Sequence, residues 1–254
     1  MALFTDGPVS GMEDLTAQDT QLPTVAAVEG IDVTQKLRLA QEELSLELEA
    51  MLDGSRGSEQ LFWQAARANI DGVVVTPALK LWHTYRALEL VYEDAYSSQL
   101  NDRYAAKRVQ FQERVKWAYE KLLQTGIGIV RSPLRQAATP RVTGAPGNLP
   151  DGTYYVAVSW TNADGEEGAA SVPATLATTA STLVVQTANP PEGAAGWNAY
   201  VGAAPEDLWQ QNESPIAIGQ TWLQPDALKA QGRAPGCGQS ASYLKPVPRR
   251  LMRG

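Results

Sequence analysis

The stretch TPALKLWHTYRALELVYEDAYSSQLNDRYAAKRVQFQERVKWAYEKLLQTG, residues 76–126, decides the fold. Thr76 is suited to cap a first helical turn, and Pro77 loses no needed hydrogen bond at the next position. Apolar residues then recur at the three- and four-residue spacing of a buried helical stripe. The segment SSQLND, residues 97–102, favours caps and turns, so we expect two helices joined by a tight turn. Gly126 is expected to end the second helix.

Upstream of this stretch, the sequence predicts at least one further helix. The run DVTQKLRLAQEELSLELEAML carries an apolar stripe, with Asp32 as its expected cap and Gly54 as its expected stop. Residues 59–70 predict a shorter helix. Residues 1–30 mix Gly, Pro, Thr and acids without a period, so we expect an extended N-terminal arm there. Together these patterns predict a helical domain over residues 31–133.

Downstream of Gly126 the pattern changes from helix to strand. Prolines and short polar runs over residues 131–140 indicate a domain boundary. Residues 153–162 alternate between apolar and smaller or polar side chains, as in a half-buried strand, and about seven short strands are expected in all. The overall prediction is an α+β multidomain chain, with an antiparallel β-sandwich over residues 134–231. A Gly-, Pro- and Arg-rich tail, residues 232–254, is expected to be disordered in the free subunit.

Composition excludes several classes of function. The chain has 254 residues and a formal net charge of −7, which argues against a general binder of nucleic acid or membrane surfaces. One cysteine, Cys237, cannot form an internal disulfide. No run is apolar for the roughly 20 residues that a membrane span needs, and the N-terminus does not resemble a secretion signal. We therefore expect a soluble intracellular product.

No strong catalytic constellation is visible in the sequence. His83 is the single histidine, and we interpret it as a packing or surface residue because no partners for a triad or zinc site accompany it. The run DGEE, residues 164–167, lacks the alternating ligands of a calcium loop and predicts a hairpin turn. A distant pair of carboxylates for sugar hydrolysis has no positive support. We expect no enzyme, no cofactor and no bound metal.

Two features indicate a binding protein. The basic tail could dock on an acidic partner or line a DNA path, or it could be a solvated end. Its candidate contact residues are Tyr243, Arg249, Arg250, Leu251, Met252 and Arg253. Aromatic residues of the predicted sandwich could stack on sugars, although core packing is the favoured interpretation. These aromatic residues are Trp197, Tyr200, Trp209 and Trp222.

Three segments resemble the head–tail connector (adaptor) proteins of tailed double-stranded DNA phages. They are the Thr76-Pro77 helix start, YSSQLNDRY at residues 96–104 with Lys107 beyond it, and GIGIV at residues 126–130. The resemblance covers roughly residues 31–133. In that family a small helical bundle forms a ring, commonly of twelve copies, under the portal of the capsid. A C-terminal arm often reaches into the portal.

The second part of the chain resembles the fibronectin type III-like or immunoglobulin-like domains of phage structural proteins. The segments that carry this likeness are TYYVAVSWTNADGEEGAAS and PEGAAGWNAYVG. The resemblance implies a virion protein of the neck, assembled in the host cytoplasm, with no membrane partner. Its implied partners are further copies of itself, the portal protein and a stopper, tail or nozzle protein. Genomic DNA would pass through the ring without sequence-specific binding.

A ring subunit needs a second apolar face for its neighbours, and the central helices carry more aromatic residues than one stripe requires. The candidate interface residues are Trp82, Tyr85, Tyr92, Tyr96, Trp117 and Tyr119. The alternative hypothesis is a phage tail or surface component whose sandwich binds host glycans. A third hypothesis is an enzyme with a hidden pair of carboxylates.

Overall fold

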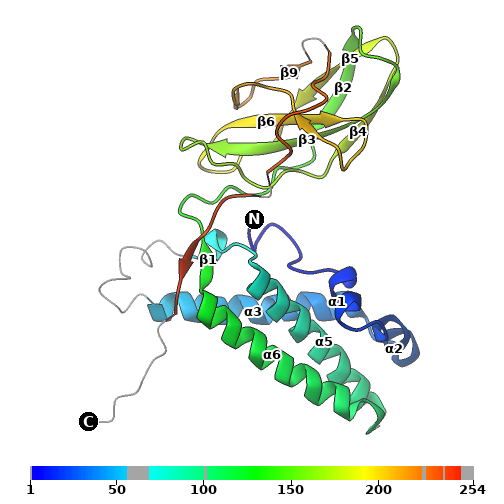
Figure 1. The fold of residues 1–254 in the computed structure, drawn as a ribbon, viewed down its shortest axis with the longest axis vertical. Coiled ribbons are helices and arrows are strands. Elements are labelled where there is room, and N and C mark those ends of the chain that lie inside the picture. Colours follow the sequence, from blue (N-terminus) through cyan, green and yellow to red (C-terminus); the bar gives the residue numbers. More distant parts are fainter. Residues whose placement is uncertain (1, 56–68, 100–101, 225–226, 237, 247–254) are drawn as a thin grey trace. The chain divides into compact units, whose positions relative to one another are not determined.

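The computed structural model describes residues 2–55, 69–99, 102–224, 227–236 and 238–246. It is an α+β chain that divides into two compact units (Figure 1). The helical unit comprises Gly7–Arg131 and Ala241–Gly254, and the β unit comprises Met1–Asp6 and Ser132–Ser240. The boundary between Arg131 and Ser132 falls inside the connector expected over residues 131–140.

The helical unit is organised around one helix, α5, which contacts α1, α2, α3 and α6. The helices are α1 (Met12–Gln18), α2 (Leu22–Glu29), α3 (Val33–Ser55), α5 (Pro77–Gln99) and α6 (Ala105–Thr125), with short 3₁₀ turns η1 (Ile70–Gly72) and η2 (Asp102–Tyr104). Helices α5 and α6 form an antiparallel hairpin, because Trp82 packs on Tyr119 and Tyr92 packs on Phe111. The two predicted central helices are therefore present. Helix α5 extends to Gln99, three residues into the turn predicted over residues 97–102, and residues 100 and 101 lie outside the described residues.

The helix ends follow the predicted caps with one exception. Asp32 accepts hydrogen bonds from the backbone of Thr34 and Gln35 at 2.9 and 3.2 Å. Thr76 accepts one from the Leu79 backbone at 3.3 Å. The prediction that Gly54 ends the first long helix was wrong by one residue, since α3 continues to Ser55. The helix predicted over residues 59–70 lies almost wholly outside the described residues.

The N-terminal segment is not the extended arm that the sequence predicted. Helices α1 and α2 occupy residues 12–29, and they contact α5. Their buried residues are Leu15, Leu22 and Val25. A proline in the first turn of α2 and Gly30 at its end, with φ of +67°, are ordinary helix boundary signals. These helices have only seven and eight residues, which is too short for apolar periodicity to identify them.

A small antiparallel sheet closes the helical unit after α6. Strand β1 (Ile127–Ile129) pairs with β10 (Ser242–Leu244), which comes from the C-terminal part of the chain. On its other side, β1 meets the buried connector before α5, because the Val74 N–H donates to the Gly128 carbonyl at 3.0 Å. Gly128 is required here, since a Cβ at this position would lie 2.7 Å from a Val74 methyl carbon.

The β unit contains two antiparallel sheets (Figure 1). Its strands are β2 (Arg141–Pro146), β3 (Gly152–Asn162), β4 (Ala174–Thr178), β5 (Ser181–Gln186), β6 (Ala194–Gly202), β7 (Trp209–Gln210), β8 (Ile216–Ala217) and β9 (Trp222–Leu223). One sheet has the order β2-β5-β9, and the other has the order β4-β3-β6-β7 with β8 also on β6. Both sheets contribute to one apolar core, including Trp160 and Trp197 from one and Leu183 and Trp222 from the other.

Strand β3 is buried on both faces, which corrects the prediction of a half-buried strand. Tyr154, Val156, Val158 and Trp160 enter the shared core, as the alternation predicted. The other face also lacks solvent, because Ala157 packs with Tyr200 and Leu208. The chain after β9 runs back along the same unit, where the Gln210 N–H donates to the Arg233 carbonyl at 2.9 Å. The hairpin turn predicted from residues 164–167 is present: the Gly165 N–H donates to the Asn162 carbonyl, and Gly165 has φ of +77°.

The C-terminal segment is held by both units, so the expectation of a disordered tail from Gly232 is wrong for its described part. Gln239 is buried, accepts from the Leu134 backbone at 2.7 Å and donates to the Ser132 carbonyl at 2.9 Å. The next residues form β10 in the helical unit. Most of the β unit, Ser132–Ser240, is therefore an insertion between two paired strands of the helical unit, which changes the predicted domain limits.

Candidate interaction surfaces and buried polar clusters

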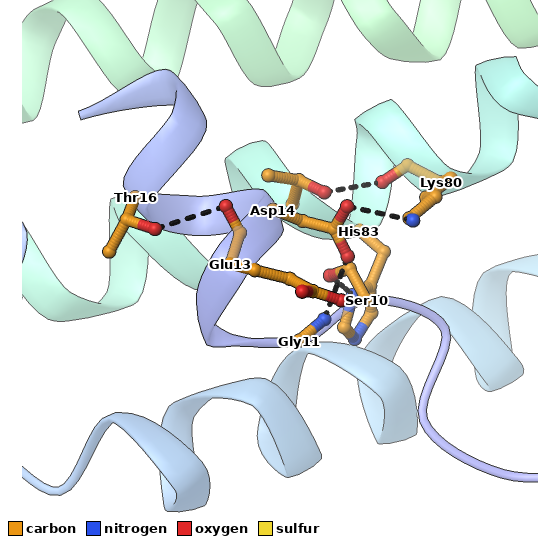
Figure 2. A network of polar contacts seen from close by, with 8 residues as sticks. Ser10, Gly11, Glu13, Asp14, Thr16, Lys80 and His83 are labelled. Atoms are coloured by element: carbon orange, nitrogen blue, oxygen red, sulfur yellow. Dashed lines mark hydrogen bonds and ion pairs between the residues drawn. The ribbon is translucent and has the colours of Figure 1, made fainter. Parts of the chain in front are cut away.

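The single histidine, on α5, contacts Ser10 of the N-terminal segment (Figure 2) and a backbone carbonyl of α3. His83 is fully buried, with Nδ1 2.6 Å from the Ser10 hydroxyl and Nε2 3.0 Å from the Leu37 carbonyl oxygen. Because a carbonyl only accepts, Nε2 carries the proton and Nδ1 accepts from Ser10. Burial lowers the pKa of His83, which keeps the ring in this neutral form.

A second contact in Figure 2 fastens α1 to the same helix. The Asp14 carboxylate accepts from the Gly11 N–H at 2.9 Å and forms an ion pair with Lys80 at 2.7 Å. Burial alone would raise the pKa of Asp14, but hydrogen bonds from Lys80 and Gly11 and the charge of Lys80 lower it overall. The N-terminal segment is thus attached to α5 through a neutral pair and a charged pair.

The Ser10–His83 pair has the residue types of a nucleophile and its base, yet its geometry is structural. A catalytic pair needs an accessible nucleophile and a base oriented by a third group. Ser10 is only 3% exposed, and the second nitrogen of His83 donates to a backbone carbonyl instead of to an orienting side chain. The pair therefore connects the N-terminal segment to α5, which agrees with the packing role predicted for His83.

Asp19, at the end of α1, forms the other polar anchor of the helical unit. Its carboxylate is 5% exposed and accepts from the Tyr92 hydroxyl at 2.6 Å and from Lys107 at 2.9 Å. Burial opposes ionisation, but these hydrogen bonds outweigh it and lower the pKa of Asp19. The pKa of Tyr92 is raised by burial and by its bond to Asp19. One carboxylate thus ties α1 to both helices of the hairpin.

Three of the six candidate interface residues belong to the interior of the subunit. Trp82, Tyr85 and Tyr92 are buried. Tyr85 and Tyr92 both pack on the Phe111 ring of α6, with ring centroids 6.5 and 5.4 Å apart. These aromatic residues fill the space between α5 and α6, which corrects that part of the prediction. Tyr85 and Tyr92 are not available to a neighbouring copy, and Trp82 reaches the surface only at the base of a groove.

The other three candidates lie nearer the surface. Tyr96 and Tyr119 are half-buried, and the Arg108 guanidinium lies 4.4 Å from the centroid of the Tyr96 ring. Trp117 is 41% exposed and touches Tyr85 edge to face, with ring centroids 6.5 Å apart. Trp117 is therefore the strongest remaining candidate for a contact between subunits.

A groove of about 560 Å³ lies between α3, α5 and α6. It is lined by buried apolar residues and by charged residues of all three helices. The lining residues are Glu43, Leu44, Leu46, Glu47, Trp82, Arg86, Val115, Lys116 and Tyr119. Arg86 is held by Glu43 and Glu89, each at 2.5 Å, so this guanidinium is already neutralised within the subunit.

The predicted portal-binding tail is only partly described. Tyr243 lies in β10, is 52% exposed and lines a second hollow of about 400 Å³ beside the start of α5 and the end of α6. Leu244, the next residue, is buried. The other predicted contact residues lie outside the described residues; they are Arg249, Arg250, Leu251, Met252 and Arg253.

The β unit contains a buried carboxylate that the sequence did not identify. Glu167 accepts hydrogen bonds from the Ser159 and Tyr200 hydroxyls and forms an ion pair with Arg233 of the C-terminal segment. Burial, and then the bond to Glu167, raise the pKa of Tyr200. The cluster fixes the C-terminal segment onto the second face of β3, because both hydroxyl groups and the partly solvated Arg233 guanidinium contact the one carboxylate.

The aromatic residues considered for sugar stacking are mainly core residues. Trp197 and Tyr200 are fully buried, Trp222 is buried, and Trp209 is half-buried. A stacking platform needs an exposed ring face, which the first three do not offer. The favoured interpretation of these residues as core packing is therefore confirmed for three of the four.

No family model matches the sequence, and no curated protein matches it. Among the described residues, no group of three or more His, Cys, Asp or Glu side chains is placed to hold a metal ion. None of the helices in the described ranges is long and apolar enough to cross a membrane.

Sequence reasoning missed Ser10, Asp14, Asp19 and the Glu167 cluster. Only Asp14 had a local signal, because an acid three residues after Gly11 suits the first turn of a helix. The partners of the other residues lie far away along the chain: 73 residues separate Ser10 from His83 and also Asp19 from Tyr92. No local pattern reveals such pairs.

Proposed function

We propose that this protein is a structural, non-enzymatic component of the head–tail junction of a tailed double-stranded DNA phage. In this proposal its helical unit forms a ring between the portal and the tail or neck, with twelve copies as in the connector family. The helical bundle is of the connector type, and the β unit is an immunoglobulin- or fibronectin type III-like domain that decorates the neck.

The observation that carries this proposal is the insertion of the β unit into a helical unit that is complete without it. The segments that resemble connectors occupy structural positions: Thr76 caps α5, and Gly126, with φ of +94°, ends α6 before β1. Strand β10 then completes the unit from the far side of the insertion. The extra domain is thus an addition within a compact helical subunit, not a replacement for part of it.

The surface of the helical unit supports an assembling protein. Large apolar side chains are exposed on its long helices, namely Leu46 on α3 and Val109 and Trp117 on α6. Aromatic and large apolar residues are enriched in the cores of subunit interfaces. Strand β10 belongs to the helical unit, so the basic residues that follow it in the sequence are covalently attached to the part of the chain that would form the ring.

The proposal defines partners and location. The partners are further copies of the chain, the portal protein and a stopper, tail or nozzle protein, with genomic DNA passing through the ring without sequence-specific contacts. The protein would be located in the neck of the virion after assembly in the host cytoplasm.

Electron microscopy and mass measurement of the purified full-length chain over a concentration series test this proposal. We expect closed rings with a central channel, either for the chain alone or after co-expression with the portal protein encoded in the same genome. A matched control is Val172→Ser, which removes an exposed apolar side chain from the β unit and is expected to leave ring formation unchanged. A chain that stays monomeric under both conditions would contradict the proposal.

A further inference from the structure

The exposed side of α3 carries an acidic stripe with a leucine at its centre. Glu42, Leu46 and Glu49 are exposed, and Leu46 is 69% accessible. At 100° per residue they lie on the opposite side of the helix from its buried stripe, which consists of Ala40, Leu44, Leu48 and Leu52. Leu46 also borders the groove between α3, α5 and α6. An exposed leucine alone is ordinary, but one between two acids is a small apolar patch with a charged border.

One flank of α6 carries the complementary pattern. Arg114 and Trp117 are exposed and Lys121 is half-buried, so a large aromatic ring lies between two basic residues. Trp117 is the most exposed of the tryptophans that the structure describes. The buried stripe of this helix, formed by Phe111, Ala118 and Leu122, faces another direction.

The two stripes match in register when the helices run antiparallel. Counting forward on α6, the spacing from Arg114 to Trp117 to Lys121 is three and then four residues. Counting backward on α3, the spacing from Glu49 to Leu46 to Glu42 is also three and then four. With a rise of about 1.5 Å per residue, both outer charges are separated by about 10.5 Å along their helices.

We infer that α3 of one copy packs antiparallel against α6 of a neighbouring copy, with Leu46 on Trp117, Glu42 facing Lys121 and Glu49 facing Arg114. This inference rests on the proposed ring, since it names the contact that repeats around it. The occupant is a second copy because the same chain carries both stripes, with opposite charge and matching spacing. A contact between two different faces repeats head to tail, which is the arrangement that closes a ring.

The apolar pair and the charges have separate roles in this contact. Exposed ion pairs are individually weak, so the burial of Leu46 and Trp117 supplies most of the adhesion. The charges select the partner and the direction of the helices. Two acidic residues of α6, Glu113 and Glu120, each precede a basic residue of the stripe by one position. They therefore lie about 100° away from the stripe around the helix axis and do not face the acids of α3.

On the described part of α3, Arg38 is a base next to the acidic stripe, and its Nε lies 3.9 Å from a carboxylate oxygen of Glu42. Both side chains of this pair are largely exposed, at 70% and 64%, so the pair is weak and can be exchanged for a contact with the partner.

Charge reversal on the full-length chain tests the contact. One variant carries Glu42→Lys and Glu49→Lys, and the other carries Arg114→Glu and Lys121→Glu. Each variant alone sets like charges against each other, so we expect the concentration for half-assembly to rise at least about tenfold. An equimolar mixture restores opposite charges at every contact, and we expect it to assemble near the wild-type concentration as an alternating oligomer.

Two controls separate this contact from general electrostatics. Reversal of two exposed acids outside the stripes, Glu93→Lys and Glu192→Lys, is expected to leave assembly unchanged. In a Cys237→Ser background, Leu46→Cys on one chain and Trp117→Cys on another should form a disulfide when mixed under mild oxidation. Val28→Cys, at an equally exposed position on α2, should form none with Trp117→Cys.

The outcomes distinguish this inference from the proposed function. Rings that form unchanged in both charge-reversed variants would overturn the contact and leave the connector proposal intact. A closed dimer joined by the 46–117 disulfide would support the contact and refute the ring. A wild-type chain that stays monomeric alone and with the portal protein, while the mixed variants also stay monomeric, would overturn both.

Discussion

Replacing Asp19 with alanine removes the carboxylate that holds the junction of α1 and α2 against the α5–α6 hairpin. Asp19 is nearly inaccessible, and it accepts from Tyr92 on α5 and from Lys107 on α6. The substitution leaves the helix stripes intact, so it tests the polar anchor separately from apolar packing.

The magnitude follows from what each partner loses. The Tyr92 hydroxyl is buried at 1% exposure and would lose its acceptor, which costs about 1–3 kcal/mol. The Lys107 side chain is 34% exposed and can be rehydrated, so its loss is that of a surface pair, up to about 1 kcal/mol. We expect Asp19→Ala to lower the free energy of unfolding of the helical unit by about 3 kcal/mol. Asp19→Asn, which keeps an acceptor for Tyr92, should cost about 1 kcal/mol.

Urea unfolding followed by far-UV circular dichroism measures this change, because all the described α-helices lie in the helical unit. In a Tyr92→Phe background, Asp19→Ala should cost at least about 1 kcal/mol less, since the orphaned hydroxyl is absent. The folded-state pKa of Asp19 is lowered, so its contribution is present above the ordinary value of 3.8 and is lost as the pH falls further. Additive effects of the two substitutions, or a loss below about 0.5 kcal/mol for Asp19→Ala, would refute the reasoning.

Three further predictions concern other parts of the structure. Replacing residues 132–240 with a short glycine-rich turn should retain helicity and assembly, whereas a chain ending at Arg131 should be less stable because it lacks β10; circular dichroism and mass measurement distinguish these outcomes. Lowering the pH from 7 to 5 should destabilise the helical unit more in the wild type than in His83→Gln, because the unfolded state binds the proton that buried His83 resists; equal pH dependence would contradict this. Glu167→Gln should lower the stability of the β unit by about 2 kcal/mol, and Arg233→Gln by about 1 kcal/mol because Arg233 is largely solvated; tryptophan fluorescence during unfolding measures both, and equal or negligible losses would argue against the buried cluster.

The sequence predicted the elements whose signals are local. The hairpin α5–α6 was found because Thr76 and Gly126 are strong boundary signals and because each helix exceeds 20 residues. The main strand of the β unit was found from its alternation, and its inward face was predicted correctly. Its second buried face was missed because the residues that pack on it, Tyr200 and Leu208, lie far along the chain.

The candidate site was predicted less well than the fold. Aromatic content showed that α5 and α6 carry many rings, but not that Trp82, Tyr85 and Tyr92 would pack inside the hairpin. Leu46 gave no signal, because a leucine in a helical pattern is expected to be buried. Whether an aromatic residue of α5 or α6 lies inside or outside depends on how each helix is rotated about its axis. A sequence pattern does not fix that rotation closely enough to separate neighbouring positions.

The pairing of β1 with β10 also fixes the order in which the two units can complete their folding during translation. Gly128 faces Tyr243, and 115 residues separate them in the chain. At roughly 5–20 residues per second, a ribosome needs about 6–23 s to make that interval. The β unit is complete before β10 emerges, so the helical unit is the first part to begin folding and the last to be closed. The helical unit that carries the surfaces on α3 and α6 is therefore completed only after the inserted β residues 132–240 have been translated.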